Sequence, residues 1–146
     1  MNLFLKALIF ALIAAVGNAL FVFGQKKSSV AGNPFLFLML SLCVGILLLA
    51  IASLFFPKPN YSEYFRDNYN YILITGTGIF ITYVGFYYLY AKFGASYYIL
   101  YAILSIVTTS IIVGVLIFKE TFNIFYLLSI LSAVLTIVLF FFGKKA

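Results

Sequence analysis

The side chains that most often perform catalysis are nearly absent from this chain. It contains no histidine, one cysteine (Cys43) and three acidic residues, Glu63, Asp67 and Glu120. A catalytic triad needs a base beside its nucleophile, and zinc or haem sites need histidine or cysteine ligands. All three acids lie at the edges of long apolar runs, where none can act as a buried proton carrier. We therefore expect no enzyme activity, no metal and no cofactor.

Polar residues inside the apolar runs are the remaining candidates for binding a solute. One set recurs at steps of three and four residues and so shares one helix face. Its members are Tyr98, Tyr101, Ser105, Thr108 and Ile112. Polar tips in line predict a wet interior, where tyrosine can hold an amine by cation–π contact or stack on a flat ring.

Asn18 and Tyr83 add to this set from two other runs. Asn18 lies near the middle of the first run, so its amide should face protein or a cavity. Tyr83 shares a face with Tyr87 and Tyr90. The predicted substrate path is Asn18, Tyr83, Tyr101, Ser105 and Thr108. The alternatives are an interhelical hydrogen bond for Asn18 and an interfacial belt for the tyrosines that flank a loop, which are Tyr90, Tyr97 and Tyr98.

Two strips of small residues are better suited to helix packing than to chemistry. The four-residue step from Gly78 to Thr82 lets helices approach closely, and Gly85 extends that strip. Ser129, Ser132 and Thr136 form a similar face in the last run, for which packing or dimerisation is the expected role.

Five apolar runs must position these residues. A bilayer crossing takes about 20 apolar residues, and the runs are too uniformly apolar for barrel strands. The expected spans are 3–23, 34–56, 71–91, 96–118 and 122–142. We predict an all-α integral membrane fold with five transmembrane helices, in which 1–146 is a single membrane domain. Pro57–Asn70 is the longest predicted loop, and Lys92–Ala95 and Lys119–Thr121 are predicted hairpins.

Composition supports a lipid environment. Of the 146 residues, 66% are hydrophobic and 8% are charged, whereas soluble domains carry about 25% charged residues. The net charge of +6 comes from cations at the ends of apolar runs, without the basic cluster typical of nucleic-acid binding. The partners expected are therefore the lipid bilayer and a small-molecule substrate, and no nucleic acid.

Orientation is encoded weakly. Five spans place Lys6, Lys58, Arg66 and Lys119 on one side, and Lys26, Lys27, Lys92, Lys144 and Lys145 on the other. The positive-inside rule favours a cytoplasmic C-terminus by a small margin. We expect a multi-pass protein of a prokaryotic cytoplasmic (inner) membrane.

Four short motifs resemble one repeat of the drug/metabolite transporter superfamily, of the EamA type. The first is Ala15-Val16-Gly17-Asn18 with Gln25-Lys26 and then Pro34, like the family's first hairpin. The others are 87–96, similar to the family's "aromatic-x-x-A-x-x-x-G-A-S" hairpin, Phe118-Lys119-Glu120 in place of "hydrophobic, small, Glu", and a final span with Gly143 near its end.

The resemblance implies a half-transporter. Most family members carry two five-helix repeats in opposite orientations, and this chain has one, so a homodimer would complete the fold. The chain departs from the family at Val16, where an aromatic is usual, and at Lys119. It also lacks the first-span glutamate of the small multidrug resistance proteins, so their proton exchange does not carry over.

The leading hypothesis is therefore a transport protein, a secondary carrier or exporter of a small metabolite. It would work as a homodimer by alternating access at a midplane site. One alternative is a non-transporting membrane scaffold or assembly subunit. The other is a lipid-carrier flippase, in which Lys6 and Arg66 would face phosphate headgroups.

Overall fold

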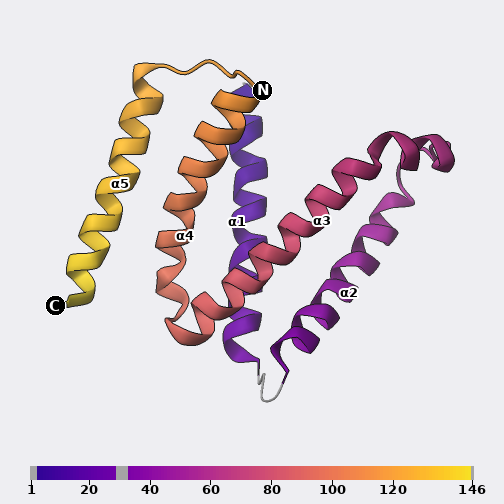
Figure 1. Ribbon diagram of the computed structural model, residues 1–146. Coiled ribbons are helices and arrows are strands. Elements are labelled where there is room, and N and C mark those ends of the chain that lie inside the picture. Colours follow the sequence, from indigo (N-terminus) through magenta and orange to yellow (C-terminus); the bar gives the residue numbers. More distant parts are fainter. Residues whose placement is uncertain (1–2, 29–32, 146) are drawn as a thin grey trace. The chain divides into compact units, whose positions relative to one another are not determined.

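The computed structural model describes residues 3–28 and 33–145, and every regular element among them is helical. The elements in chain order are α1 (Leu3–Lys27), α2 (Pro34–Ser53), α3 (Tyr61–Lys92), η1 (Ala95–Tyr97), α4 (Tyr98–Ser105), η2 (Ile106–Ile117) and α5 (Ile124–Lys145) (Figure 1). Counting Ala95–Ile117 as one segment, five helices are long and apolar enough to cross a membrane. The all-α prediction with five spanning-length helices is confirmed.

Proline and asparagine set the limits of α2. Pro34 is its first residue, as expected, because proline costs a helix nothing at that position. The Asn33 side chain accepts a hydrogen bond of 3.2 Å from the Leu36 N–H and so caps the helix. At the other end α2 stops at Ser53, short of the predicted Phe56. Pro57 and Pro59 follow within a few residues, and proline disfavours helical backbone just before it.

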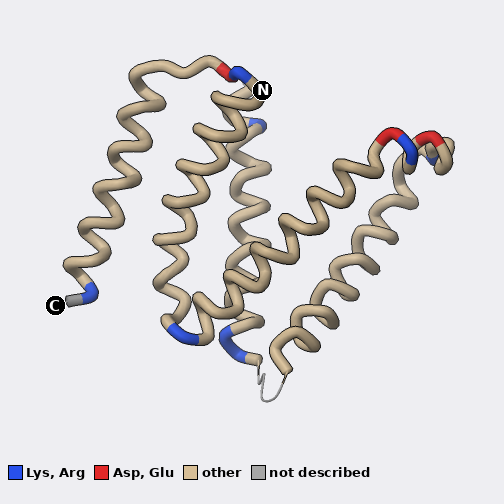
Figure 2. Tube along the Cα trace, in the orientation of Figure 1, with Lys and Arg blue, Asp and Glu red and all other residues tan. Residues whose placement is uncertain are grey.

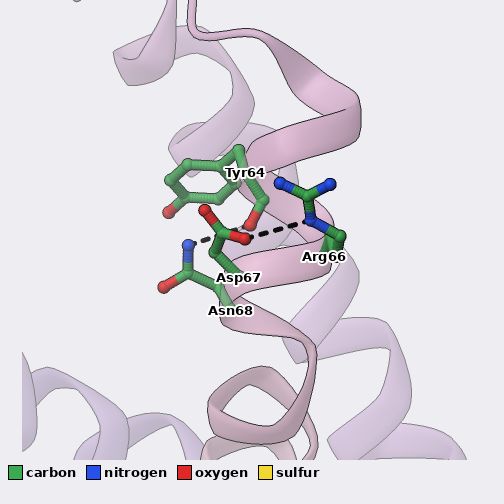
Figure 3. Close-up of polar contacts among 4 residues, drawn as sticks. All are labelled: Tyr64, Arg66, Asp67 and Asn68. Carbon is green, nitrogen blue, oxygen red and sulfur yellow. Dashed lines mark hydrogen bonds and ion pairs between the residues drawn. The ribbon is translucent and has the colours of Figure 1, made fainter.

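The prediction that Pro57–Asn70 is a loop was wrong for most of its length. Helix α3 begins at Tyr61 and runs for 32 residues. The Tyr64 N–H donates to the Asn60 carbonyl at 2.9 Å, and the Asn68 side chain donates to the Tyr64 carbonyl at 2.8 Å (Figure 3). No proline or glycine follows Pro59 in this stretch, so nothing in the chain interrupts the helix.

A glycine follows the end of α3. Gly94 has φ 99° and ψ 164°, a backbone conformation open essentially to glycine alone. It stops the helix two residues after Lys92, and the 3₁₀ turn η1 then starts at Ala95. The connection between α3 and η1 is therefore two residues long, Phe93 and Gly94, and its backbone requires glycine.

The chain divides into two compact units, Met1–Lys92 and Phe93–Ala146. In the first unit α3 packs against both α1 and α2. Its centre is aromatic: the ring of Phe21 lies 4.7 Å from Tyr83 and 5.8 Å from Phe86. Phe86 stacks on Tyr90 at 5.3 Å. Tyr90 is 1% exposed, so it is a core residue of the structure and not part of an exposed belt.

The second unit is an antiparallel pair formed by α4 with η2 and by α5. Ile103 is its buried residue of α4. Tyr97 and Phe140 meet edge to face at 5.3 Å, and the Lys144 Nζ lies 5.0 Å from the centre of the Tyr97 ring. An aromatic contact and a cation–π contact therefore hold the start of α4 to the end of α5.

The twelve residues of η2 form a π-helix, which the sequence did not lead us to expect. Its backbone bonds span five residues instead of four, so its turns are wider than those of an α-helix. Such turns are rare and often accompany functional sites. Here the wide turns carry Thr108, Thr109 and Ser110, and they end beside Glu120.

Apolar surface dominates both units. Among the described residues the buried hydrophobic side chains are Leu38, Phe86, Tyr90 and Ile103. Charged residues gather near helix ends and in connections (Figure 2). Long helices with apolar sides and charged ends are compatible with a multi-pass membrane protein.

Candidate functional site

A cavity of about 480 Å³ lies between α2 and α3 in the first unit. Its lining is Asn33, Phe35, Leu36, Leu38, Met39, Leu42, Phe80, Tyr83 and Val84. The volume is within the range of small-molecule pockets. No charged side chain occurs among these lining residues, so the cavity suits a neutral or aromatic solute.

Tyr83 is the predicted path residue that lines this cavity. Its ring is half-buried and fixed on one side by Phe21, with ring centres 4.7 Å apart. The contact joins α1 to α3. Replacing Tyr83 would therefore alter both the lining of the cavity and the packing of α1 on α3.

Asn18 lies on α1 in the same unit and is half-buried. Within the described ranges its amide makes no hydrogen bond, and it does not line the α2–α3 cavity. An amide in an apolar helix needs a polar partner. Both interpretations of Asn18, a helix-joining hydrogen bond and a place on the substrate path, thus stay predictions.

Gln25 is a second polar group that the helices of the first unit enclose. It is 9% exposed, and neither its amide nitrogen nor its amide oxygen has a hydrogen-bond partner among the residues the structure describes. It borders a hollow of about 200 Å³ with Lys26, Ser28, Tyr87, Tyr90 and Ala91. A buried amide without a partner costs about 1–3 kcal/mol, so a polar partner from outside the described residues would stabilise this end of α1.

The remaining three path residues lie in the second unit. Tyr101 is half-buried on α4, with its ring 5.5 Å from that of Tyr98. Ser105 is half-buried at the end of α4. Thr108 is exposed on η2, and its hydroxyl donates to the Leu104 carbonyl at 2.9 Å. The widened turn of η2 changes the three- and four-residue spacing on which a single continuous face was predicted.

The predicted path is therefore divided between the two units. Asn18 and Tyr83 belong to the first, and Tyr101, Ser105 and Thr108 to the second. Among the hollows described above and in the second unit, the α2–α3 cavity is lined by one of the five, Tyr83. Their joint role as one path stays a prediction.

The glycines of the predicted packing strip face open space. A Cβ atom built at Gly78 or Gly85 would have no heavy atom within 4 Å in the described chain. Thr82, between them, is half-buried. Within the described part of the first unit, therefore, no other helix packs closely against these two glycines.

The hydroxyls of the α5 strip are satisfied within their own helix. Ser129, Ser132 and Thr136 donate to the carbonyls of Phe125, Leu128 and Ser132, at 2.9, 2.9 and 3.0 Å. All three donors are exposed. Because these hydroxyls are already bonded within α5, the three residues would favour contact with a neighbouring helix through their small size.

Sequence reasoning missed a third hollow, of about 300 Å³, in the second unit. It lies between η2, the connection 118–123 and the start of α5, and Glu120 is its charged residue. The prediction placed Glu120 in a tight Lys119–Thr121 hairpin and gave it no role. The hollow depends on a contact between Glu120 and Gly114, which are six residues apart in the sequence. That spacing could have been recognised only if the π-helix had been predicted.

Comparison with known proteins finds no match: no family model, no curated protein and no solved structure matches this chain. The resemblance to the EamA type of transporter repeat thus rests on the short motifs alone.

Proposed function

We propose that the chain inserts into a lipid bilayer through its five long helices and acts there as half of a secondary transporter. Two copies would form the working unit and move a small metabolite by alternating access. The observation that carries this proposal is the α2–α3 cavity of about 480 Å³, lined by the predicted path residue Tyr83.

The residues that line the cavity limit the class of solute it can bind. Its lining is aliphatic and aromatic, with Asn33 as the amide at one end and the Tyr83 hydroxyl as a second polar tip. Pockets of this type bind by apolar contact and use a few polar groups for orientation. A neutral or aromatic metabolite fits this lining best.

Backbone conformation supports the family resemblance at two positions. The glycine of the resembling "G-A-S" motif is Gly94, at φ 99°. The small residue of the "hydrophobic, small, Glu" ending falls at Lys119, whose φ is 55°. Both conformations suit glycine. The backbone therefore favours a small residue at each of the two positions where the family motif has one. This chain carries glycine at the first position and lysine at the second.

Flux into liposomes tests the proposal. The purified protein, reconstituted at neutral pH, should raise uptake of at least one neutral or aromatic metabolite from a panel of amino acids and nucleosides over protein-free vesicles. Replacing Tyr83 with Leu should lower that uptake roughly tenfold, because a ring that faces the solute is lost. Tyr71→Leu is the matched control, since Tyr71 lies on α3 outside the cavity and should keep the flux.

A flippase is the second candidate, because an apolar cavity also accommodates a hydrocarbon chain. It predicts that a fluorescent phospholipid or polyprenyl phosphate is exchanged between leaflets while metabolite flux stays at background. Arg66, whose Nε lies 3.3 Å from the Asp67 Oδ1 (Figure 3), would then contact phosphate. Arg66→Gln should abolish lipid exchange and leave metabolite flux unaffected. The absence of both fluxes would favour the scaffold subunit instead.

A further inference from the structure

The hollow of the second unit brings a carboxylate, hydroxyls and aromatic rings together. Glu120 supplies the carboxylate, Thr109 and Ser110 of η2 supply hydroxyls, and Phe122 and Tyr126 supply rings. The volume of about 300 Å³ is at the lower end of ordinary ligand pockets. All of these groups belong to the second unit, Phe93–Ala146.

A left-handed residue turns Glu120 back onto the helix it follows. Lys119 has φ 55°, a conformation that often terminates helices. The Glu120 N–H then donates to the Gly114 carbonyl at 3.0 Å, and the Phe118 N–H donates to the Val113 carbonyl at 3.0 Å. These bonds hold the backbone of Glu120 against the end of η2.

Gly114 leaves the space that the carboxylate fills. A Cβ atom at this position would lie 3.0 Å from the Glu120 Oε2 and 3.6 Å from its Cδ. Even alanine would require the carboxylate to shift by a few tenths of an ångström, and a larger residue would require a larger shift. Gly114 itself is buried, so the carboxylate covers the one place on this face where the helix has no side chain.

Among the described side chains of the second unit, Glu120 has no cationic partner. Within 3–28 and 33–145 the ion pair found is Arg66 with Asp67, in the other unit. A carboxylate accepts hydrogen bonds and donates none, so it needs donors, and the rings nearby attract positive charge over their faces. Phe122 and Tyr126 stack with centres 6.3 Å apart and form one wall of the hollow.

We propose that this hollow binds a small organic ammonium ion, with its charged nitrogen at Glu120 and its hydrocarbon part against Phe122 and Tyr126. An anion would be repelled by the carboxylate. A neutral solute would lack the charge-assisted hydrogen bond, which is roughly twice as strong as a neutral one. An inorganic cation would gain little from the apolar part of the lining. The site is separate from the α2–α3 cavity, so ammonium binding and metabolite flux can fail independently.

A charge-matched ligand pair tests the proposal on the unmodified protein. Phenethylammonium and 2-phenylethanol share one shape and differ in the ammonium group. Calorimetric titration of the full chain in detergent at pH 7 should show at least tenfold tighter binding of the ammonium ion. Equal affinities would overturn the proposal, and so would displacement of the amine by sodium chloride at equal concentration, which would indicate an inorganic cation site.

Three variants locate the binding. Glu120→Gln keeps the size of the side chain and should weaken phenethylammonium binding at least tenfold. Gly114→Ala displaces the carboxylate and should weaken it several-fold. Glu63→Gln, which removes the same charge at the exposed start of α3, should bind as the wild type does. Wild-type affinity in Glu120→Gln would refute the site.

Discussion

At the scale of single residues, two left-handed backbone positions decide where helices end. Gly94 separates α3 from η1, and Lys119 separates η2 from the connection to α5. Glycine adopts such angles without steric cost, whereas a side chain meets its own backbone. A local hydrogen bond offsets the strain at Lys119, because the turn lets the Glu120 N–H donate to the Gly114 carbonyl.

Replacing Gly94 with Ala should destabilise the protein by about 1–3 kcal/mol, because residues with a side chain rarely adopt φ near 100°. The melting temperature of the purified protein in detergent is the measurement. Gly45→Ala is the control: Gly45 lies within α2 with φ in the ordinary range and open space around a built Cβ. A helical glycine of this kind gains about 0.5–1 kcal/mol on substitution. Equal melting temperatures for the two variants would contradict the expectation.

At the scale of elements, the length of α3 is the main difference from the prediction. Its 32 residues correspond to about 48 Å of helix, while the hydrocarbon core is about 30 Å thick. The excess matches its polar start, where Glu63, Arg66 and Asp67 lie. In a bilayer this first part would extend into the headgroup region or beyond, as a rigid helix instead of a loop.

Spin labels distinguish that helix from a loop. Single nitroxides at consecutive positions 62–69, in a Cys43→Ser background that removes the native cysteine, should show accessibility to a water-soluble relaxing agent with a period of about 3.6 residues. Labels at 57–59, in the coil before α3, serve as the comparison. A smooth profile without a period across 62–69 would show that the helix does not form in the bilayer.

At the scale of the whole molecule, the small number of buried side chains is the dominant fact. Large apolar residues on every long helix are exposed, including Leu20, Leu49, Phe80, Leu116 and Phe125. Surfaces this apolar are covered by lipid or by protein. The open glycine strip of α3 and the small-residue strip of α5 are the places where a second copy could approach most closely.

Native mass spectrometry of the protein in mild detergent should show two copies of the 16.4 kDa chain. Ser132→Ala should leave the dimer intact, because the hydroxyl already bonds to the Leu128 carbonyl. Ser132→Leu should lower the dimer fraction several-fold by blocking close approach. Ser53→Leu is the matched control, since Ser53 also bonds within its own helix, to the Ala50 carbonyl, and lies outside both strips. A wild type that stays monomeric at all concentrations would exclude the homodimer.

The sequence by itself determined that the described chain is helical, with five helices long and apolar enough to cross a membrane. Long uninterrupted apolar runs permit only helices in lipid, and Pro34 and Gly94 act on the backbone next to them. These are local effects, readable from the residues in order. The start of α3 was missed because polar residues were taken to signal a loop, whereas helix formation depends on backbone propensity and the absence of breakers.

Only the tertiary structure decided which polar groups meet. Tyr83 was selected from its spacing, but its place beside Phe21 and the α2–α3 cavity depends on how α1, α2 and α3 pack. The contact between Glu120 and Gly114 depends on a π-helix and a left-handed lysine, neither of which has a distinctive residue pattern. A sequence fixes each residue's chemistry and its neighbours along the chain, while a binding site requires groups that are distant in the chain to lie close in space.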